Sequence, residues 1–214
     1  MSASKNYTPT DGYTEIVKPG EMGITKLHFG ILTLTPDATF FDHSDDTEVA
    51  LIALGGDCTL LVGHNGNKAY GTLGQRRDVF HSEACIAYIP HHTTYEILTR
   101  ETGIEIAVCK VQSHSESAAV ILGEGETIGE DETNLRIWEN VFSEGSDIRV
   151  NGEAVCFQRF RDTDDVAVYD VTRTTETVRV SVYHNDVFTL SEHDSLLTLA
   201  SKGIGYQLWV QPRK

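Results

Sequence analysis

Short runs of strand length, separated by turn residues, fill most of the sequence. Residues 26–111 show no 3.6-residue period of an amphipathic helix, while residues 135–142 fit either a short helix or a strand. In KLHFGILTLT (26–35), for example, Leu27, Phe29 and Ile31 fall on one side of an extended chain. Roughly eight such runs lie between residues 26 and 111, and two of them are joined by Asn65-Gly66, a dipeptide typical of hairpin turns. This rhythm predicts an antiparallel β-barrel or sandwich, and a closed jelly roll if the residues at the barrel mouth converge.

A second group of strand-like runs begins at residue 154 and continues almost to the end of the chain. Between the two groups, residues 113–134 are acidic and Gly-rich, which is typical of a linker, here with one apolar docking segment, AAVIL (118–122). We therefore expect two related β-barrels in tandem, the second one reduced. The expected parts are an N-terminal arm (1–20), a first barrel (21–112), the linker (113–134) and the second barrel (135–214).

The chain carries 32 acidic and 17 basic residues, a formal net charge of −15. Such a charge repels phosphate backbones and anionic lipids, so it argues against nucleic-acid and membrane partners. Residues 1–15 lack the apolar core of a signal peptide, and no run approaches the roughly 20 apolar residues of a membrane span. The four cysteines stand apart in apolar runs, as small buried thiols do. These features predict a cytoplasmic protein.

Histidines and a glutamate mark the expected mouth of the first barrel. His43 is followed by an acidic run and then by Glu48, while Pro90 is followed by His91 and His92. A His and a Glu at this spacing, facing a second His-bearing strand, are typical of divalent-metal sites in β-barrels. The expected metal ligands are His43, Glu48 and His92, suited to Zn, Mn, Fe or Ni, and Glu48 and His92 are also the expected catalytic residues.

The alternative is a polar mouth without a metal, and it is favoured because the His43–Glu48 spacing often occurs by chance. Glu48 would then pair with Arg76 or Arg77. The two arginines are themselves the expected clamp for a carboxylate of the substrate, since a guanidinium binds a carboxylate bidentately. Salt bridges to nearby acidic residues are the alternative role for them. Tyr95 is the third expected substrate-binding residue, by stacking on a sugar ring, with core packing as the alternative.

Several segments resemble a known family. LHFGILTLTPDATF, TEVALIALGG, LGQRRDVF and AYIPHHTTYEI resemble the N-terminal half of the 5-deoxy-glucuronate isomerases of myo-inositol catabolism, which are related to the 5-keto-4-deoxyuronate isomerases of pectin breakdown. The resemblance is clearest over residues 23–111, and VCFQRF and GYQLWVQPR resemble the closing strands of the same fold. It implies an all-β bicupin, that is, two tandem jelly-roll barrels.

The resemblance also implies a chemistry. In the family the C-terminal barrel holds a metal through a His-x-His pair, a Glu and a later His, and the enzyme interconverts an aldehyde and a ketone in a sugar acid. Such an aldose–ketose isomerisation needs a base that moves a proton between adjacent carbons and a Lewis acid that polarises both oxygens.

This sequence departs from the family pattern in its second half and from the usual metal-ligand set of cupin barrels in its first half. Residues 138–161 contain no histidine, and the C-terminal part has only His184 and His193, with Asp186 or Glu192 as possible oxygen ligands. In the first half, Phe41 stands where the leading pair of histidines would begin, and Tyr95 stands where the late histidine would be. The metal site of the second barrel is therefore expected to be lost.

Two functions follow as hypotheses. The first is an isomerase that acts on a sugar acid, with its chemistry moved to the first barrel or sustained by His184, His193 and nearby carboxylates. The second is a non-catalytic cupin that binds a carbohydrate-like ligand or a partner protein. A purely structural, dimerising cupin is a third reading. A homo-oligomer is expected in all three cases.

Overall fold

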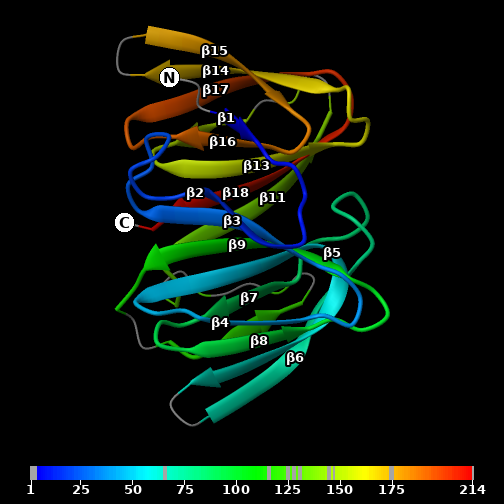
Figure 1. Ribbon diagram of the computed structural model, residues 1–214. Coiled ribbons are helices and arrows are strands. Elements are labelled where there is room, and N and C mark those ends of the chain that lie inside the picture. Colours follow the sequence, from blue (N-terminus) through cyan, green and yellow to red (C-terminus); the bar gives the residue numbers. More distant parts are fainter. Residues whose placement is uncertain are drawn as a thin grey trace. The chain divides into compact units, whose positions relative to one another are not determined.

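The computed structural model describes residues 4–64, 67–114, 117–123, 126, 129, 132–143, 146, 148–173 and 176–213 (Figure 1). The hairpin turn expected at Asn65-Gly66 lies outside the described residues. Every regular element within them is a β-strand, which confirms the all-β prediction. No helix of the described part is long and apolar enough to cross a membrane.

The strands, in chain order, are β1 (Ser4–Asn6), β2 (Gly12–Val17), β3 (Leu27–Leu34), β4 (Thr39–His43), β5 (Thr47–His64), β6 (Asn67–Arg76), β7 (Ile86–Ile89), β8 (Thr94–Leu98), β9 (Ile104–Gln112), β10 (Val120–Leu122), β11 (Leu135–Phe142), β12 (Val150–Asn151), β13 (Ala154–Phe160), β14 (Val166–Arg173), β15 (Glu176–Tyr183), β16 (Asp186–Leu190), β17 (Asp194–Ser201) and β18 (Gly205–Pro212).

The chain divides into two compact units. We call Pro9–Glu15, His28–Leu135 and Arg213–Lys214 the first barrel, and Met1–Thr8, Ile16–Leu27 and Arg136–Pro212 the second barrel. The segment expected as an N-terminal arm contributes to each of them, since β1 pairs with β16 of the second barrel. The segment expected as a linker contributes β10, which pairs with β7 of the first barrel through residues of AAVIL.

The long strand β5 organises the first barrel. Its first half pairs with β7 and β9, and its second half pairs with β6 and β8, while β4 adds to β8. Register shifts at Ala53/Gly55 and Gly56/Asp57 separate the two halves, and β5 bends there (Figure 1). Gly56 adopts φ +88°, and a Cβ atom at this position would lie 2.0 Å from the carbonyl oxygen of Gly103. The bend therefore requires glycine.

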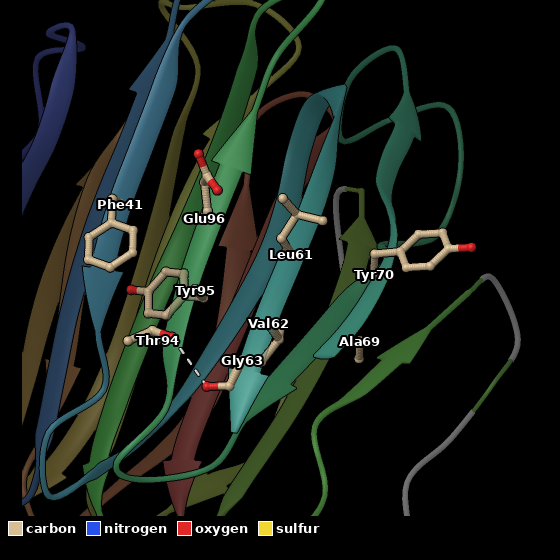
Figure 2. Close-up of a pocket in the computed structure, with 9 residues that line it drawn as sticks. All are labelled: Phe41, Leu61, Val62, Gly63, Ala69, Tyr70, Thr94, Tyr95 and Glu96. Atoms are coloured by element: carbon tan, nitrogen blue, oxygen red, sulfur yellow. Dashed lines mark hydrogen bonds between the residues drawn. The ribbon is translucent and has the colours of Figure 1, made fainter. Parts of the chain in front are cut away.

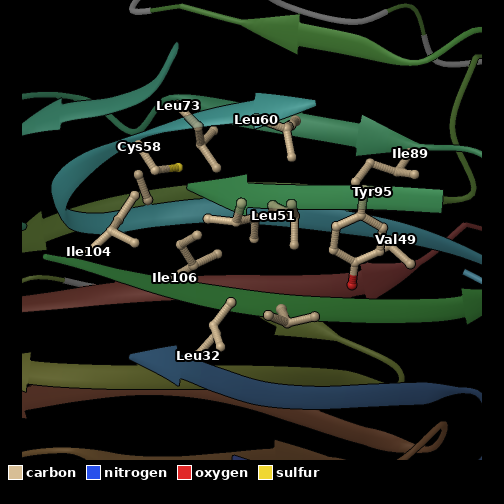
Figure 3. Close-up of a cluster of buried hydrophobic side chains, with 14 of the residues drawn as sticks. Leu32, Val49, Leu51, Cys58, Leu60, Leu73, Ile89, Tyr95, Ile104 and Ile106 are labelled. Atoms are coloured by element: carbon tan, nitrogen blue, oxygen red, sulfur yellow. The ribbon is translucent and has the colours of Figure 1, made fainter. Parts of the chain in front are cut away.

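Apolar side chains fill the first barrel (Figure 3). They come from alternate positions of each strand, as the two-residue period of a strand requires. The core includes Leu32, Val49, Leu51, Ala53, Cys58, Leu60, Val62, Leu73, Tyr95, Ile97, Ile104, Ile106 and Val108.

The second barrel has two sheets, with strand orders β1-β16-β13-β18-β11 and β12-β17-β14-β15. Its core is rich in aromatic rings: Phe188 lies edge-on to Trp209, and Tyr169 stacks on Phe188. All four cysteines of the chain are buried free thiols, and burial raises the pKa of Cys58 to about 12. These thiols are unreactive at neutral pH.

Candidate functional site

Glu48, expected as a metal ligand and as a catalytic carboxylate, lies on the opposite face of β5 from the core of the first barrel. The core residues Val49, Leu51 and Ala53 are at odd positions, so the even position 48 points the other way. Glu48 therefore does not face into the barrel, as the metal site expected at its mouth would require.

The Glu48 carboxylate is buried and anchors the segment that follows β10. It accepts hydrogen bonds from the Thr133 hydroxyl, from the backbone N–H of Asn134 (3.0 Å to Oε2) and from the Asn134 side-chain amide (3.1 Å). Each of its oxygens has at least one donor within the protein. This pattern satisfies a buried carboxylate and leaves little capacity for a metal.

The two histidines expected beside Glu48 lie elsewhere. Phe40 packs on the core, so His43 points away from it, and its Nδ1 lies 2.9 Å from Asp45 Oδ1. His92 occupies the turn between β7 and β8 with φ 53°, and its Nε2 lies 3.4 Å from Asp46 Oδ1. Each imidazole thus has an aspartate neighbour of its own, and the structure does not bring the three expected ligands together.

The residues present do not fit the metal centre that the sequence suggested for this barrel. Among the described residues, no group of three or more His, Cys, Asp or Glu side chains is placed to hold a metal ion. The Nδ1 atom of His91 is buried without a hydrogen-bond partner, but no such group surrounds it. No reaction step is therefore assigned to a metal in this barrel.

Arg76, expected as half of a carboxylate clamp, supports the backbone instead. Its buried guanidinium donates hydrogen bonds to the carbonyl oxygens of Ala53 (3.2 Å), Asp78 (3.1 Å) and Val79 (2.9 Å). The side chain therefore ties the loop after β6 to the bend of β5. The neighbouring Arg77 is exposed.

Tyr95, the third residue expected to bind substrate, belongs to a polar cluster at one end of the barrel core. Its hydroxyl donates a hydrogen bond to Asp42 Oδ2 (2.7 Å), and the Lys110 ammonium lies 3.1 Å from the same oxygen. Lys110 follows Ile104, Ile106 and Val108 on the core face of β9. We call Tyr95, Asp42 and Lys110 the barrel-end cluster.

The barrel-end cluster is accessible to solvent. The side chains of Lys110 and Asp42 are 20% and 33% exposed. Beside them, the Tyr13 ring packs on Gly30, and the Lys110 Nζ atom lies 5.8 Å from the centroid of that ring. A solute that reaches this end of the barrel meets a cation, a carboxylate and an aromatic ring.

The protonation states in the cluster follow from the same contacts. Burial alone would raise the pKa of Asp42, but hydrogen bonds from Tyr95, the His43 backbone and Lys110 outweigh it, so the pKa is lowered. Burial, together with nearby acidic groups, raises the pKa of Tyr13, and burial with the hydrogen bond to Asp42 raises that of Tyr95. At neutral pH the cluster therefore presents an ionised Asp42 and a protonated Tyr95, beside the protonated phenol of Tyr13.

Asp42→Asn is expected to remove part of the acid sensitivity of the fold. Because the folded pKa of Asp42 is lowered, its contribution to the free energy of unfolding is complete above the unfolded pKa of about 3.9 and is lost as the pH falls through the folded pKa. Urea unfolding of both proteins should show a difference that is largest near neutral pH and shrinks below about pH 4. A difference that stays constant with pH would contradict this assignment.

The interior of the second barrel carries a hydrogen-bonded polar chain instead of histidines. Gln158 and Gln207 are directly paired across β13 and β18, and both amides bond the Tyr169 hydroxyl. The Gln207 side-chain oxygen also accepts a hydrogen bond from Trp209 Nε1 (3.1 Å). All four residues are fully buried. Amides, a phenol and an indole are not the donor set of a transition-metal centre.

The histidines of the second barrel lie outside its core. His184 contacts the backbone of Phe160 through Nδ1, and His193 is exposed. Asp186 accepts hydrogen bonds from Asn6 and from the backbone of Tyr183, while Glu192 is exposed. The donor set expected at this place therefore does not fit a metal either.

Sequence reasoning missed Asp42, Lys110 and Tyr13. One signal was present: Lys110 interrupts the apolar alternation of IEIAVCKVQ, and a charged residue on the core face of a strand is uncommon. Asp42 and Lys110 are far apart in sequence, and only the strand order brings them together.

A groove lies on the outer face of the same barrel, across β4, β8, β5 and β6 (Figure 2). It has a volume of about 330 Å³, and it is lined by Phe41, Leu61, Val62, Gly63, Ala69, Tyr70, Thr94, Tyr95 and Glu96.

Comparisons with known proteins extend this description. A family model described as the KduI/IolB family matches residues 3–149, more than half of the chain. No curated protein sequence matches the chain. Among solved structures, an IolB-like protein from Salmonella typhimurium LT2 is similar, with a TM-score of 0.81 and 19% identity over 99% of this chain and 93% of that one.

Two further structures share the architecture. Oxalate decarboxylase from Bacillus subtilis has a TM-score of 0.66 and 12% identity, over 100% of this chain and 76% of that one. A cupin 2 conserved barrel domain protein from Leptotrichia buccalis has a TM-score of 0.55 and 12% identity, over 98% of this chain and 96% of that one. These likenesses concern the fold, and they confirm the expected all-β bicupin.

Proposed function

Because the chain belongs to the KduI/IolB family, a family of sugar-acid isomerases, we propose that its first barrel binds a sugar acid or a related polyhydroxy compound without the family's metal-dependent isomerisation. The family resemblance read from the sequence is confirmed. The proposal that the barrel binds a ligand without metal-dependent catalysis rests on one observation. The charged and polar groups at the end of the first barrel core form a solvent-accessible set of donors and acceptors, the barrel-end cluster, whereas the expected metal ligands are held apart.

The chemistry of the barrel-end cluster suits such a ligand. An ammonium has three donors, and of these the described residues engage one, on Asp42. The remaining donors are available to a carboxylate or to hydroxyl groups of a ligand. The Asp42 carboxylate accepts hydrogen bonds from hydroxyls, and the Tyr13 ring offers an apolar face to the C–H side of a sugar.

The hydrogen bonds of Glu48, and those among the buried polar residues of the second barrel, support the same proposal. An isomerisation that needs a Lewis acid requires ligands that converge with open positions. Glu48 is instead saturated by Thr133 and Asn134, and Gln158, Tyr169 and Gln207 bond one another. These groups supply stability rather than a reaction centre.

Lys110→Met is expected to weaken binding of D-glucuronate at least tenfold, because it removes the cation and keeps the volume of the side chain. Isothermal titration calorimetry measures the affinity. Lys202→Met, an exposed lysine of the second barrel, serves as the matched control and should bind like the wild type. D-Glucose, which lacks the carboxylate, should bind more weakly than D-glucuronate to the wild type. Its affinity for Lys110→Met should be nearly the same as its affinity for Lys202→Met.

An activity assay separates the two hypotheses read from the sequence. Incubation of the protein with an aldehyde-bearing sugar acid, followed by NMR, should show no ketone product above the buffer control. Conversion that persists after exhaustive chelation and is lost in Lys110→Met would reveal a metal-independent isomerase at the same site. Binding that does not change in Lys110→Met would refute the proposed site.

A further inference from the structure

The groove on the outer face of the first barrel carries a second inference; it shares Tyr95 with the barrel-end cluster, but its argument depends on other side chains. Its middle row crosses four strands in direct register: Phe41 is opposite Glu96, Glu96 is opposite Leu61, and Leu61 is opposite Tyr70. Side chains directly opposite one another on a sheet face are close neighbours. Figure 2 shows Glu96 between Phe41 and Leu61, with Tyr70 on the far strand.

Glu96 is the acidic group of this row. Its side chain is half-buried, and its two cross-strand neighbours are apolar. No hydrogen bond or ion pair to its carboxylate exists among the residues that the structure describes. A carboxylate between apolar neighbours in a groove favours a cation that brings its own apolar surface.

Two exposed aromatic rings lie at the two ends of this row, Phe41 beside Glu96 and Tyr70 beyond Leu61. Phe41 is 67% exposed and Tyr70 is 81% exposed, although both are large apolar residues on a regular sheet face. The negative face of an aromatic ring attracts ammonium and guanidinium groups. The hollow extends beside Gly63, which has no side chain, and the Thr94 hydroxyl bonds the Gly63 carbonyl there (3.2 Å).

We propose that this groove binds an organic cation, namely a primary ammonium group carried on an apolar chain. The ammonium pairs with Glu96 and lies against Phe41, while the apolar chain covers Leu61 towards Tyr70. A volume of about 330 Å³ is at the small end of the range for ligand sites, which suits an alkylammonium group. The net charge of −15 raises the local concentration of any cation and so assists the encounter.

Two other occupants fit the groove less well. A second copy of the chain, docked groove to groove, would bring two Glu96 carboxylates together without a cation between them. A neutral sugar would leave the carboxylate charge uncompensated. The positive charge of the ligand is therefore the property that the groove selects.

The experiment titrates hexylammonium into the full-length protein and follows binding by two-dimensional NMR. The buffer contains 150 mM salt, at which the Debye length is about 8 Å, so that attraction by the overall charge of the protein is screened. Amide signals of β4, β5 and β8 around the groove should shift. The neutral isostere 1-hexanol should bind at least tenfold more weakly, and hexanoate should cause no shift.

Three variants complete the test. Glu96→Gln should weaken hexylammonium binding at least tenfold and abolish the preference over hexanol, and Phe41→Ala should weaken it at least threefold. Glu101→Gln, an exposed acid outside the groove lining, removes the same charge and should change the affinity by less than twofold. All three should keep the affinity of the wild type for D-glucuronate, which separates this site from the barrel-end cluster.

Several results would overturn the proposal. Equal binding of hexylammonium and hexanol would mean that the groove is merely apolar. Equal losses in Glu96→Gln and Glu101→Gln would mean that only the overall charge matters. Concentration-dependent shifts at the groove without ligand, removed by Tyr70→Ala, would assign this face to a second copy of the chain.

Discussion

Glu48→Ala is expected to lower the free energy of unfolding by about 3 kcal/mol, because it leaves the Asn134 backbone N–H and two further donors without their buried acceptor. The loss concerns the anchor between β5 and the segment around Thr133, so amide exchange should rise first in residues 132–135 and in β10. Urea unfolding and hydrogen exchange measure the two effects. Glu48→Gln should lose less, since its side-chain oxygen still accepts from one donor while its amide faces the others.

Glu101→Ala is the control for Glu48→Ala. It removes an exposed carboxylate in the turn before β9 and should change stability by no more than about 0.5 kcal/mol. If Glu48 were a metal ligand in a polar mouth, Glu48→Ala would instead leave the metal-free protein nearly as stable as the wild type. That outcome would contradict the anchoring role.

Arg76→Ala is expected to destabilise the first barrel by about 2–4 kcal/mol. Three backbone carbonyls, those of Ala53, Asp78 and Val79, would lose a charged donor, and the buried aliphatic stem would leave a void. Arg76→Lys should recover only part of the loss, because one ammonium cannot reproduce the planar fork that spans the three carbonyls. Chemical unfolding of the purified variants measures these differences.

Arg77→Ala is the matched control, because Arg77 is the next residue in the chain and is exposed. Its effect on stability should stay within about 0.5 kcal/mol. Neither arginine variant should change the affinity for D-glucuronate when the affinity is calculated for the folded fraction of each protein. A stable Arg76→Ala protein with a specific loss of sugar-acid binding would restore the carboxylate clamp that the sequence suggested.

The strands and the two-barrel architecture could be predicted because alternation and turn residues are local signals. The orientation of Glu48 could not, because residues 49–54 are apolar on both faces of β5. A strand that is buried on both sides loses the alternation that tells its faces apart. The spacing of His43 and Glu48 then carried no information on whether they meet.

The barrel-end cluster shows the second limit. Asp42, Tyr95 and Lys110 come from β4, β8 and β9, and their contacts depend on which strands are neighbours and on their register. A shift of one residue in register would turn each side chain to the other face. Lys110 carried a sequence signal, as a charge on an otherwise apolar face, whereas Asp42 carried none that distinguished it from the acidic residues after it.

The family resemblance, by contrast, depends on whole segments, and the family model matches residues 3–149. Membership of a family fixes the fold more firmly than the chemistry, because function depends on the particular side chains at a site. In this chain the second barrel keeps its strands while Gln158, Tyr169 and Gln207 occupy its interior.

Metal content tests the central claim most directly. The protein, purified without chelators and dialysed against metal-free buffer, should contain far less than one transition-metal ion per chain, and a His43→Ala/His92→Ala variant should not differ from it. A stoichiometric ion that disappears in the double variant would show that these residues converge on a metal after all. Such a result would contradict metal-independent binding in the first barrel and restore metal-dependent isomerisation as its function.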